Sequence, residues 1–238
     1  MPEPSTHPAP AHAGPAAPPP KRFVLGISGA SGAAYALGLL EQLLTRGHEV
    51  HLVVSDYGRR LLFDEARIRQ VSFDDLLPHL ADRFPEPPAD RNGRGCSPGP
   101  SIRDRLICHP HKDVGAVIAS GSFLHDGMVV LPCSSTSLGA IATGAGSNLL
   151  CRAAMVTLKE RRPLIICHRE SPLNLIDIEN MRTLTLAGAT ICPTNPGFYL
   201  HPKSVQDIID FTVGKVLDLL KVEHDLKTRW EHHDPADR

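Results

Sequence analysis

The sequence has few aromatic residues, almost no net charge and no long apolar run. Phe, Trp and Tyr make up 5% of the 238 residues, and 25 Lys and Arg nearly balance 26 Asp and Glu. A chain without a basic excess has no electrostatic attraction for nucleic acid, so we expect no nucleic-acid partner. No apolar stretch approaches the roughly 20 residues that cross a bilayer, so we expect no membrane segment.

Cysteine and histidine are present, but not in the spacings of disulfide or metal sites. The six cysteines are scattered without a CxxC pair, and Cys133, Cys167 and Cys192 fall at the ends of predicted strands. This pattern is typical of buried thiols in a reducing compartment, so we expect a cytoplasmic protein. The 13 histidines contain no HExxH or comparable cluster. The sequence therefore predicts no metal site.

Composition divides the chain into a domain with extensions. Residues 1–20 are rich in Pro and Ala, without the apolar core of a signal peptide, and predict a disordered tail. Residues 21–222 predict a single domain. Within it, residues 82–112 are rich in Pro, Gly and charge, which indicates a long surface insertion. Residues 223–238 form a predicted C-terminal extension.

Short apolar runs alternate with helical patterns along the domain. The predicted strands are residues 22–28, 49–55, 116–120, 128–134, 163–168 and 189–193. The predicted helices are residues 33–44, 57–67, 73–80, 137–142, 148–160 and 175–187, and a last helix with Ser204 as its N-cap. This alternation predicts an α/β fold, in which helices cover both faces of a mostly parallel sheet.

The first strand, turn and helix contain a glycine- and serine-rich segment. Gly26, Gly29 and Gly32 are three residues apart, with Ser28 and Ser31 between them. Such a turn can present backbone N–H groups to a phosphate at a helix N-terminus. It can equally be a tight turn that requires small residues, because neither a GxGxxG nor a P-loop motif is present.

Polar residues follow several predicted strands. Ser55 ends the second strand, and residues 28–31, 120–122 and 133–137 follow three others. Arg169 and Glu170 follow the fifth strand directly. Because ligands of parallel sheets bind at the carboxyl ends of the strands, this pattern favours a pocket for a phosphate and a polar ring. An adjacent Arg and Glu can bind phosphate and handle a proton.

These segments together resemble the UbiX-type flavin prenyltransferases. The matching segments include GISGASGAAYALGLL, VVS, MVVLPCSSTSLGAIATGAGSNLLCRAA, LKERRPLIICHRESP, PGFY and HPKSVQDIIDF. The resemblance implies a three-layer α/β/α Rossmann-like flavoprotein fold. It implies transfer of a dimethylallyl group from dimethylallyl monophosphate to N5 and C6 of reduced FMN, without a metal. It also implies a UbiD-type decarboxylase as recipient of the prenylated FMN, and a homo-oligomer, a dodecamer in the family, with sites shared between subunits.

The resemblance also implies roles for individual residues. Glu170, Glu65 and Ser31 would be catalytic, and Lys159, Tyr199 and Lys215 would hold the prenyl phosphate. Lys215 stands where the family usually has an arginine, and Asp56 where many members have a lysine. The residues implied in FMN binding are Gly29, Ala30, Ser31, Ser55, Ser134, Ser135, Thr136, Ser137 and Arg169.

Two other functions use similar flavin-binding segments. An FMN-dependent cysteine decarboxylase would need its own substrate-clamping motif, which the sequence does not show. A non-catalytic FMN-binding subunit of an aromatic acid decarboxylase would not need the set formed by Lys159, Glu170, Tyr199 and Lys215. Prenylation is therefore the activity that the sequence favours.

Overall fold

The computed structural model describes residues 19–84 and 101–228, and a six-stranded parallel sheet runs through them. The order of the strands is β3-β2-β1-β4-β5-β6, and every neighbouring pair is parallel. This order confirms the α/β class and its Rossmann-like arrangement. The strands are β1 (Arg22–Ile27), β2 (Glu49–Val54), β3 (Leu106–His109), β4 (Gly127–Cys133), β5 (Leu164–His168) and β6 (Thr190–Ile191).

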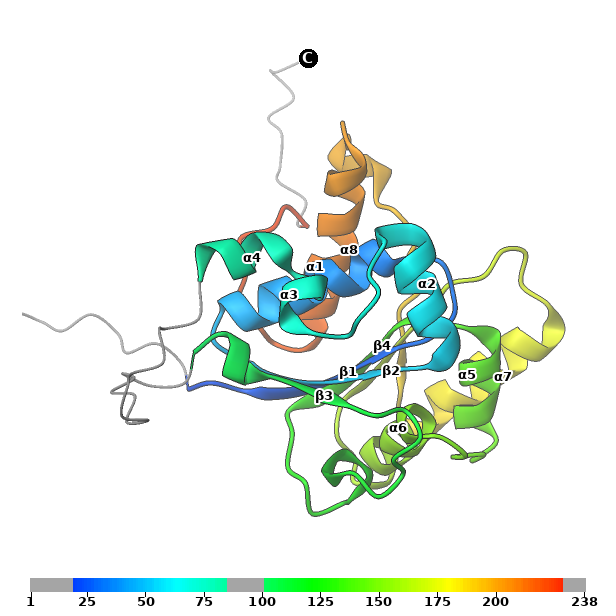
Figure 1. The fold of residues 1–238 in the computed structure, drawn as a ribbon. Helices are drawn as coiled ribbons and strands as arrows, with labels where there is room; N and C mark the ends of the chain where they lie inside the picture. The colour runs from blue at the N-terminus through cyan, green and yellow to red at the C-terminus, as the bar shows by residue number, and fades with distance from the viewer. Residues whose placement is uncertain (1–18, 85–100, 229–238) are drawn as a thin grey trace, which may run out of the picture.

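Helices cover both faces of the sheet, so the three-layer prediction is confirmed (Figure 1). One layer contains α1 (Ala33–Thr45), α2 (Asp56–Ala66), α3 (Phe73–Leu76), α4 (Pro78–Arg83) and α8 (Val205–Leu219). The other contains α5 (Ser135–Ala142), α6 (Leu149–Lys159) and α7 (Leu175–Ala187). The 3-10 helices are η1 (Arg103–Arg105), η2 (Val117–Ala119) and η3 (Phe198–Leu200).

The central strand β1 contributes to both hydrophobic cores. Phe23, Leu25 and Ile27 belong to the core under α1 and α8. Val24 belongs to the core on the opposite face, with residues of α5 and α6. A strand that is buried on both faces needs apolar residues at successive positions. This requirement explains the continuous apolar run that identified the strand in the sequence.

Polar caps fix the starts of the helices that follow the strands. Ser55, Ser134 and Asn174 are the N-caps of α2, α5 and α7, and each side chain accepts a backbone N–H of the first turn. Ser204 caps α8, as predicted, and it also forms a capping box with Asp207. These caps place the helix starts beside the carboxyl ends of the strands.

The third strand is not where the sequence pattern indicated. The apolar pattern predicts a strand over residues 116–120, but these residues contain η2 instead. The third strand is β3, which lies inside the predicted insertion 82–112 and pairs with β2. At the sheet edge, β3 has four residues that are only partly buried or exposed, so it lacks the apolar signature of a buried strand. Residues 85–100 of the predicted insertion, and residues 1–18 of the predicted tail, lie outside the described residues.

The described part of the predicted C-terminal extension packs against the domain. Thr228 is 3% exposed, and a side chain at Gly214 of α8 would collide with it. Asp225 forms an ion pair with Arg46 at the end of α1. Residues 223–228 therefore belong to the folded domain, because their contacts bridge α1 and α8.

Candidate active site

The loops after β1 and β4 meet at the centre of the sheet. Here the chain leaves β1 toward one helical layer and β4 toward the other, which is where α/β sheets bind ligands. Ser28 joins the two loops: its hydroxyl donates to the Pro132 carbonyl at 2.9 Å and accepts the Ser134 N–H at 2.8 Å. Ser28 is 1% exposed. Its hydroxyl therefore fixes the loop geometry rather than facing a ligand.

A carboxylate occupies the N-terminus of α1. Glu65, from α2, accepts the backbone N–H of Gly32 at 3.0 Å and that of Ala33 at 2.8 Å. Gly32 has a φ of 132°, which favours glycine at this turn. The N–H groups that the sequence offered to a phosphate are thus already bound to Glu65. Ser31 also donates a hydrogen bond to Glu65.

Ser31, Glu65 and Arg169 form one electrostatic group although they lie far apart in the sequence. Burial by itself raises the pKa of Glu65. Hydrogen bonds from Ser31 and from the N–H groups of Ala33 and Gly32, together with the positive charge of Arg169, outweigh burial and lower that pKa. Glu65 is therefore an anion at neutral pH. The fold brings these three predicted site residues together.

Arg169 and Glu170 extend from the end of β5. The Arg169 N–H donates to the Cys133 carbonyl at 3.1 Å, which ties the end of β5 to the end of β4. Within the described residues, the buried Nε atom of Arg169 has no hydrogen-bond partner. A buried donor of this kind costs free energy until an acceptor binds it. Glu170 is exposed, and its Oε1 atom accepts the Ser171 N–H at 3.0 Å.

The serine-rich segment after β4 forms the first turn of α5. The Ser134 hydroxyl caps the helix by accepting the Ser137 N–H at 3.3 Å, and Ser137 is buried. Ser135 and the exposed Thr136 complete the turn. Across the edge, the Ser55 hydroxyl accepts the Gly58 N–H at 2.9 Å. The capping serines thus fix the helix starts at this edge of the sheet.

Asp56, whose charge departs from the family pattern, follows the Ser55 cap directly. It is exposed, and its Oδ1 atom lies 3.8 Å from Nδ1 of His111. An acidic residue in the first turn of α2 is favoured by the helix dipole. The structure therefore gives Asp56 a local stabilising role.

A buried His–Asp pair that no sequence motif indicates lies next to Arg169. The Nδ1 atom of His168 lies 3.0 Å from the Cys133 carbonyl, and its Nε2 atom lies 4.0 Å from Oδ1 of Asp177. Both residues are at most 3% exposed. Cys133 therefore accepts N–H groups from both His168 and Arg169. A polar residue at the last position of an apolar strand, just before Arg169, was the signal available in the sequence.

Of the three residues assigned to the prenyl phosphate, Lys159 lies away from Arg169 in a single chain. Lys159 ends α6 and pairs with Glu160 near Gly121, on the side where β5 begins. Tyr199 belongs to η3 and packs edge-on against Phe211, with ring centroids 5.9 Å apart. Lys215 is exposed on α8. The roles of these three residues stay predictions.

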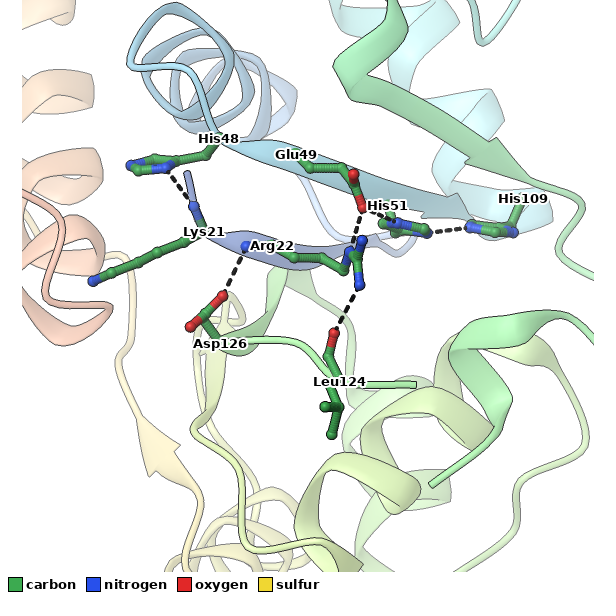
Figure 2. Close-up of polar contacts among 8 residues, drawn as sticks. All are labelled: Lys21, Arg22, His48, Glu49, His51, His109, Leu124 and Asp126. Carbon is green, nitrogen blue, oxygen red and sulfur yellow. Dashed lines mark hydrogen bonds and ion pairs between the residues drawn. The ribbon is translucent and has the colours of Figure 1, made fainter. Parts of the chain in front are cut away.

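A second polar cluster lies where β1 and β2 begin (Figure 2). We call Arg22, Glu49, His51, His109 and Asp126 the Arg22–His109 network. Arg22 pairs with Glu49, and its backbone N–H donates to Asp126 at 2.8 Å. His51 lies between Glu49 and His109, with 2.8 Å to each. The polar groups of the Arg22–His109 network are thus bound to one another.

Neither a metal cluster nor a membrane helix is found in the described part of the chain. No group of three His, Cys, Asp or Glu side chains in residues 19–84 and 101–228 is arranged to hold a metal ion. Over the same ranges, no helix combines the length and apolarity that crossing a membrane requires.

Comparisons with known sequences agree with the motifs. A family model described as Flavoprotein matches residues 15–217. A flavin prenyltransferase UbiX of Halalkalibacterium halodurans is 42% identical over 208 residues, which cover 87% of this chain and 92% of the relative. A flavin prenyltransferase LpdB of Lactiplantibacillus plantarum is 41% identical, over 89% of this chain and 98% of the relative.

Solved structures agree with the fold. The crystal structure of AnUbiX (PadA1) in complex with FMN and dimethylallyl pyrophosphate has a TM-score of 0.73 and 32% identity, over 91% of this chain and 100% of that one. A dodecameric FMN-dependent UbiX-like decarboxylase from Escherichia coli O157:H7 has a TM-score of 0.73 and 34% identity, over 89% and 100%. The FMN-dependent cysteine decarboxylase TvaF shares only the fold, with a TM-score of 0.52 and 12% identity, over 84% and 98%.

Proposed function

The chain belongs to the Flavoprotein family and, within it, to the flavin prenyltransferases, and we propose that it joins the dimethylallyl group of dimethylallyl monophosphate to reduced FMN. The observation that carries this proposal is the Nε atom of Arg169, which lies near Ser31 and Glu65 and has no hydrogen-bond partner in the described part of the chain. These groups stand at the point of the sheet where α/β proteins bind nucleotides.

The residues present at this edge fit FMN. Arg169 offers a guanidinium donor that lacks an acceptor among the described residues, and a phosphate or a flavin carbonyl oxygen would supply one. Ala30 is buried, whereas Gly29 and Ser31 next to it are exposed, so a ligand can approach this loop closely. We assign FMN binding to residues 29–31, to Ser55, to residues 134–137 and to Arg169.

Reduced FMN, when bound, supplies the nucleophilic ring positions N5 and C6. Glu170 is exposed at the same edge and is the carboxylate that we assign to moving a proton between the ring and the departing phosphate. Glu65 keeps its negative charge and orients the hydroxyl of Ser31. Because the Glu65 carboxylate already carries a negative charge at the N-terminus of α1, it attracts positively polarised groups there and repels a second anion.

The proposed phosphate residues support an assembly of several chains. Lys159, Tyr199 and Lys215 supply two cations and a hydroxyl, which a departing phosphate requires. Within one chain, Lys159 and Arg169 lie at opposite ends of the sheet. A neighbouring subunit would supply the missing groups, in line with the dodecameric relative from Escherichia coli. We propose a homo-oligomer with shared sites.

We also propose where the product goes. Prenylated FMN would serve a UbiD-type decarboxylase in the cytoplasm. A reducing compartment agrees with the free thiols of the described cysteines. This recipient would be identified by mixing the product with an apo-decarboxylase and measuring decarboxylation.

The direct test is to mix the purified protein with reduced FMN and dimethylallyl monophosphate under anaerobic conditions, and then to measure the mass of the flavin. We expect a gain of one isoprene unit. A parallel reaction with dimethylallyl diphosphate identifies the donor. If neither donor changes the flavin mass while FMN binds, the proposal is wrong. Release of carbon dioxide from a peptide with a C-terminal cysteine would instead support a cysteine decarboxylase.

A further inference from the structure

Two cysteines lie side by side at the outer edge of the sheet. The register of β5 and β6 pairs Ile165 with Thr190 and Ile166 with Ile191, so the next pair is Cys167 and Cys192. The Cys192 N–H donates to the Ile166 carbonyl at 2.9 Å, which continues the ladder to this point. Adjacent strands lie about 4.8 Å apart. That spacing falls within the range of about 4.4–6.8 Å between the Cα atoms of disulfides.

Both side chains are on the same face of the sheet. Cys167 belongs to the core under α1 and α8, and Cys192 packs against the same core. Their thiols form a hydrogen bond. Cys167 is fully buried, whereas Cys192 is partly exposed. A reagent from solution can therefore reach Cys192 first, and Cys167 only through Cys192.

The surroundings favour the thiolate at Cys192. The hydrogen bond from Cys167 lowers the pKa of Cys192, burial raises it, and the charge of Lys215 lowers it, to about 7. The same hydrogen bond and burial raise the pKa of Cys167, which keeps its proton. Cys108 reaches solvent, but the protein atoms packed around its sulfur desolvate the thiolate and raise its pKa. At neutral pH, Cys192 is the favoured nucleophile among the described cysteines.

We propose that Cys167 and Cys192 form a dithiol site that small-molecule disulfides oxidise reversibly to a disulfide bond. The Cys192 thiolate attacks one sulfur of glutathione disulfide and expels one glutathione thiolate. The Cys167 sulfur then attacks the sulfur of Cys192, and its proton passes to the second departing glutathione. Two protein thiols are oxidised, and one glutathione disulfide is reduced to two glutathiones.

The test uses the full chain and glutathione disulfide near neutral pH, followed by acid quenching, denaturation, alkylation and peptide mapping. We expect two fewer alkylated cysteines than in the reduced protein, and one peptide pair that links Cys167 to Cys192. Dithiothreitol should reverse the change. The Cys108→Ser variant should behave like the parent. The idea is overturned if the two cysteines stay separately alkylated, or if glutathione is found on Cys108 alone.

A second measurement identifies the order of the steps. In Cys167→Ala, the mixed disulfide cannot resolve, so glutathione should remain attached to Cys192. The rate of Cys192 modification in the parent should rise with pH to half its maximum near 7, the pKa that its neighbours set. A rate that rises only at the higher pH typical of an ordinary thiol would contradict the role assigned to Lys215 and Cys167. The parent peptide map decides the proposal by itself if Cys167→Ala does not fold.

Discussion

The two ends of the sheet use charged residues in opposite ways. In the Arg22–His109 network, the guanidinium, the Glu49 carboxylate and the imidazoles bind one another, and Asp126 accepts the Arg22 backbone N–H (Figure 2). At the carboxyl end, the Nε atom of Arg169 is buried and has no partner among the described residues. The side chain of Arg22 is thus bound within the chain, whereas that of Arg169 keeps a free hydrogen-bond donor among the described residues.

The difference indicates which cluster stabilises the fold and which binds a ligand. A charged group whose hydrogen bonds are complete within the chain gains little from a ligand, whereas an incomplete one gains the bonds it lacks. Arg22 also stacks over Phe123, at 5.0 Å from its ring centroid. We therefore expect substitutions in the network to change stability, and substitutions at the carboxyl end to change binding and catalysis.

The largest expected effect is on the rate of prenylation in Glu170→Gln. Glutamine keeps the size and reach of the side chain but cannot transfer a proton. Prenylation should slow by about 10²–10⁴-fold, while FMN still binds. The measurement is the initial rate of flavin mass gain, with Glu179→Gln on the exposed surface of α7 as the matched control. An unchanged rate in a folded, FMN-binding Glu170→Gln protein would remove this residue from the mechanism.

The next effect concerns FMN affinity in Arg169→Met. Methionine keeps the apolar stem but removes the donors, and charge-assisted hydrogen bonds contribute about 1.5–3 kcal/mol, so Kd should rise by about 10–100-fold. The thermal stability of the FMN-free protein should fall only slightly, because Nε loses no partner and only the attraction between Arg169 and Glu65 is lost. Titration of FMN fluorescence gives Kd, and Arg182→Met, on the exposed side of α7, is the control. Equal affinity in both variants would contradict the assignment.

The third prediction reverses the pattern at Arg22. In Arg22→Met, Glu49 loses one of its two partners and keeps His51, and Phe123 loses the stacked guanidinium. We expect a loss of about 1 kcal/mol of stability, since the pair is partly exposed, and no change in the Kd for FMN. Urea unfolding and FMN titration of the same sample separate the two results. Weaker FMN binding without lower stability would show that the two ends of the sheet do not differ as described.

The smallest effect is on the pH dependence of stability. Burial lowers the pKa of His51, Glu49 raises it in part, and Arg22 lowers it again. Burial and the neighbouring His51 lower the pKa of His109, and Asp113 opposes them only in part. Below the ordinary imidazole value of 6.5, the unfolded chain therefore binds more protons than the folded chain. Stability should fall as the pH drops through that value. Unfolding curves of His109→Gln should show a smaller fall, and an identical fall would exclude His109 as a contributor.

Much of the fold was determined by local sequence. Apolar runs such as that of β1 require burial on both faces, and capping residues such as Ser204 fix helix starts through bonds to their own first turn. Both signals act within a few residues of the chain, so they can be read without the structure. The pair Arg169–Glu170 after an apolar strand was visible for the same reason.

Contacts between distant segments were decided by the tertiary structure. The edge strand β3 is recognised only by its pairing with β2, because four partly exposed residues carry no periodic signal. Glu65 reaches the N-terminus of α1 only after α2 packs there, and Arg169 approaches Glu65 only through the order of the strands. The register of β5 and β6 likewise places Cys167 beside Cys192. Local sequence sets which elements form, whereas the order and register of the strands determine which side chains meet, because those depend on the packing of the whole sheet.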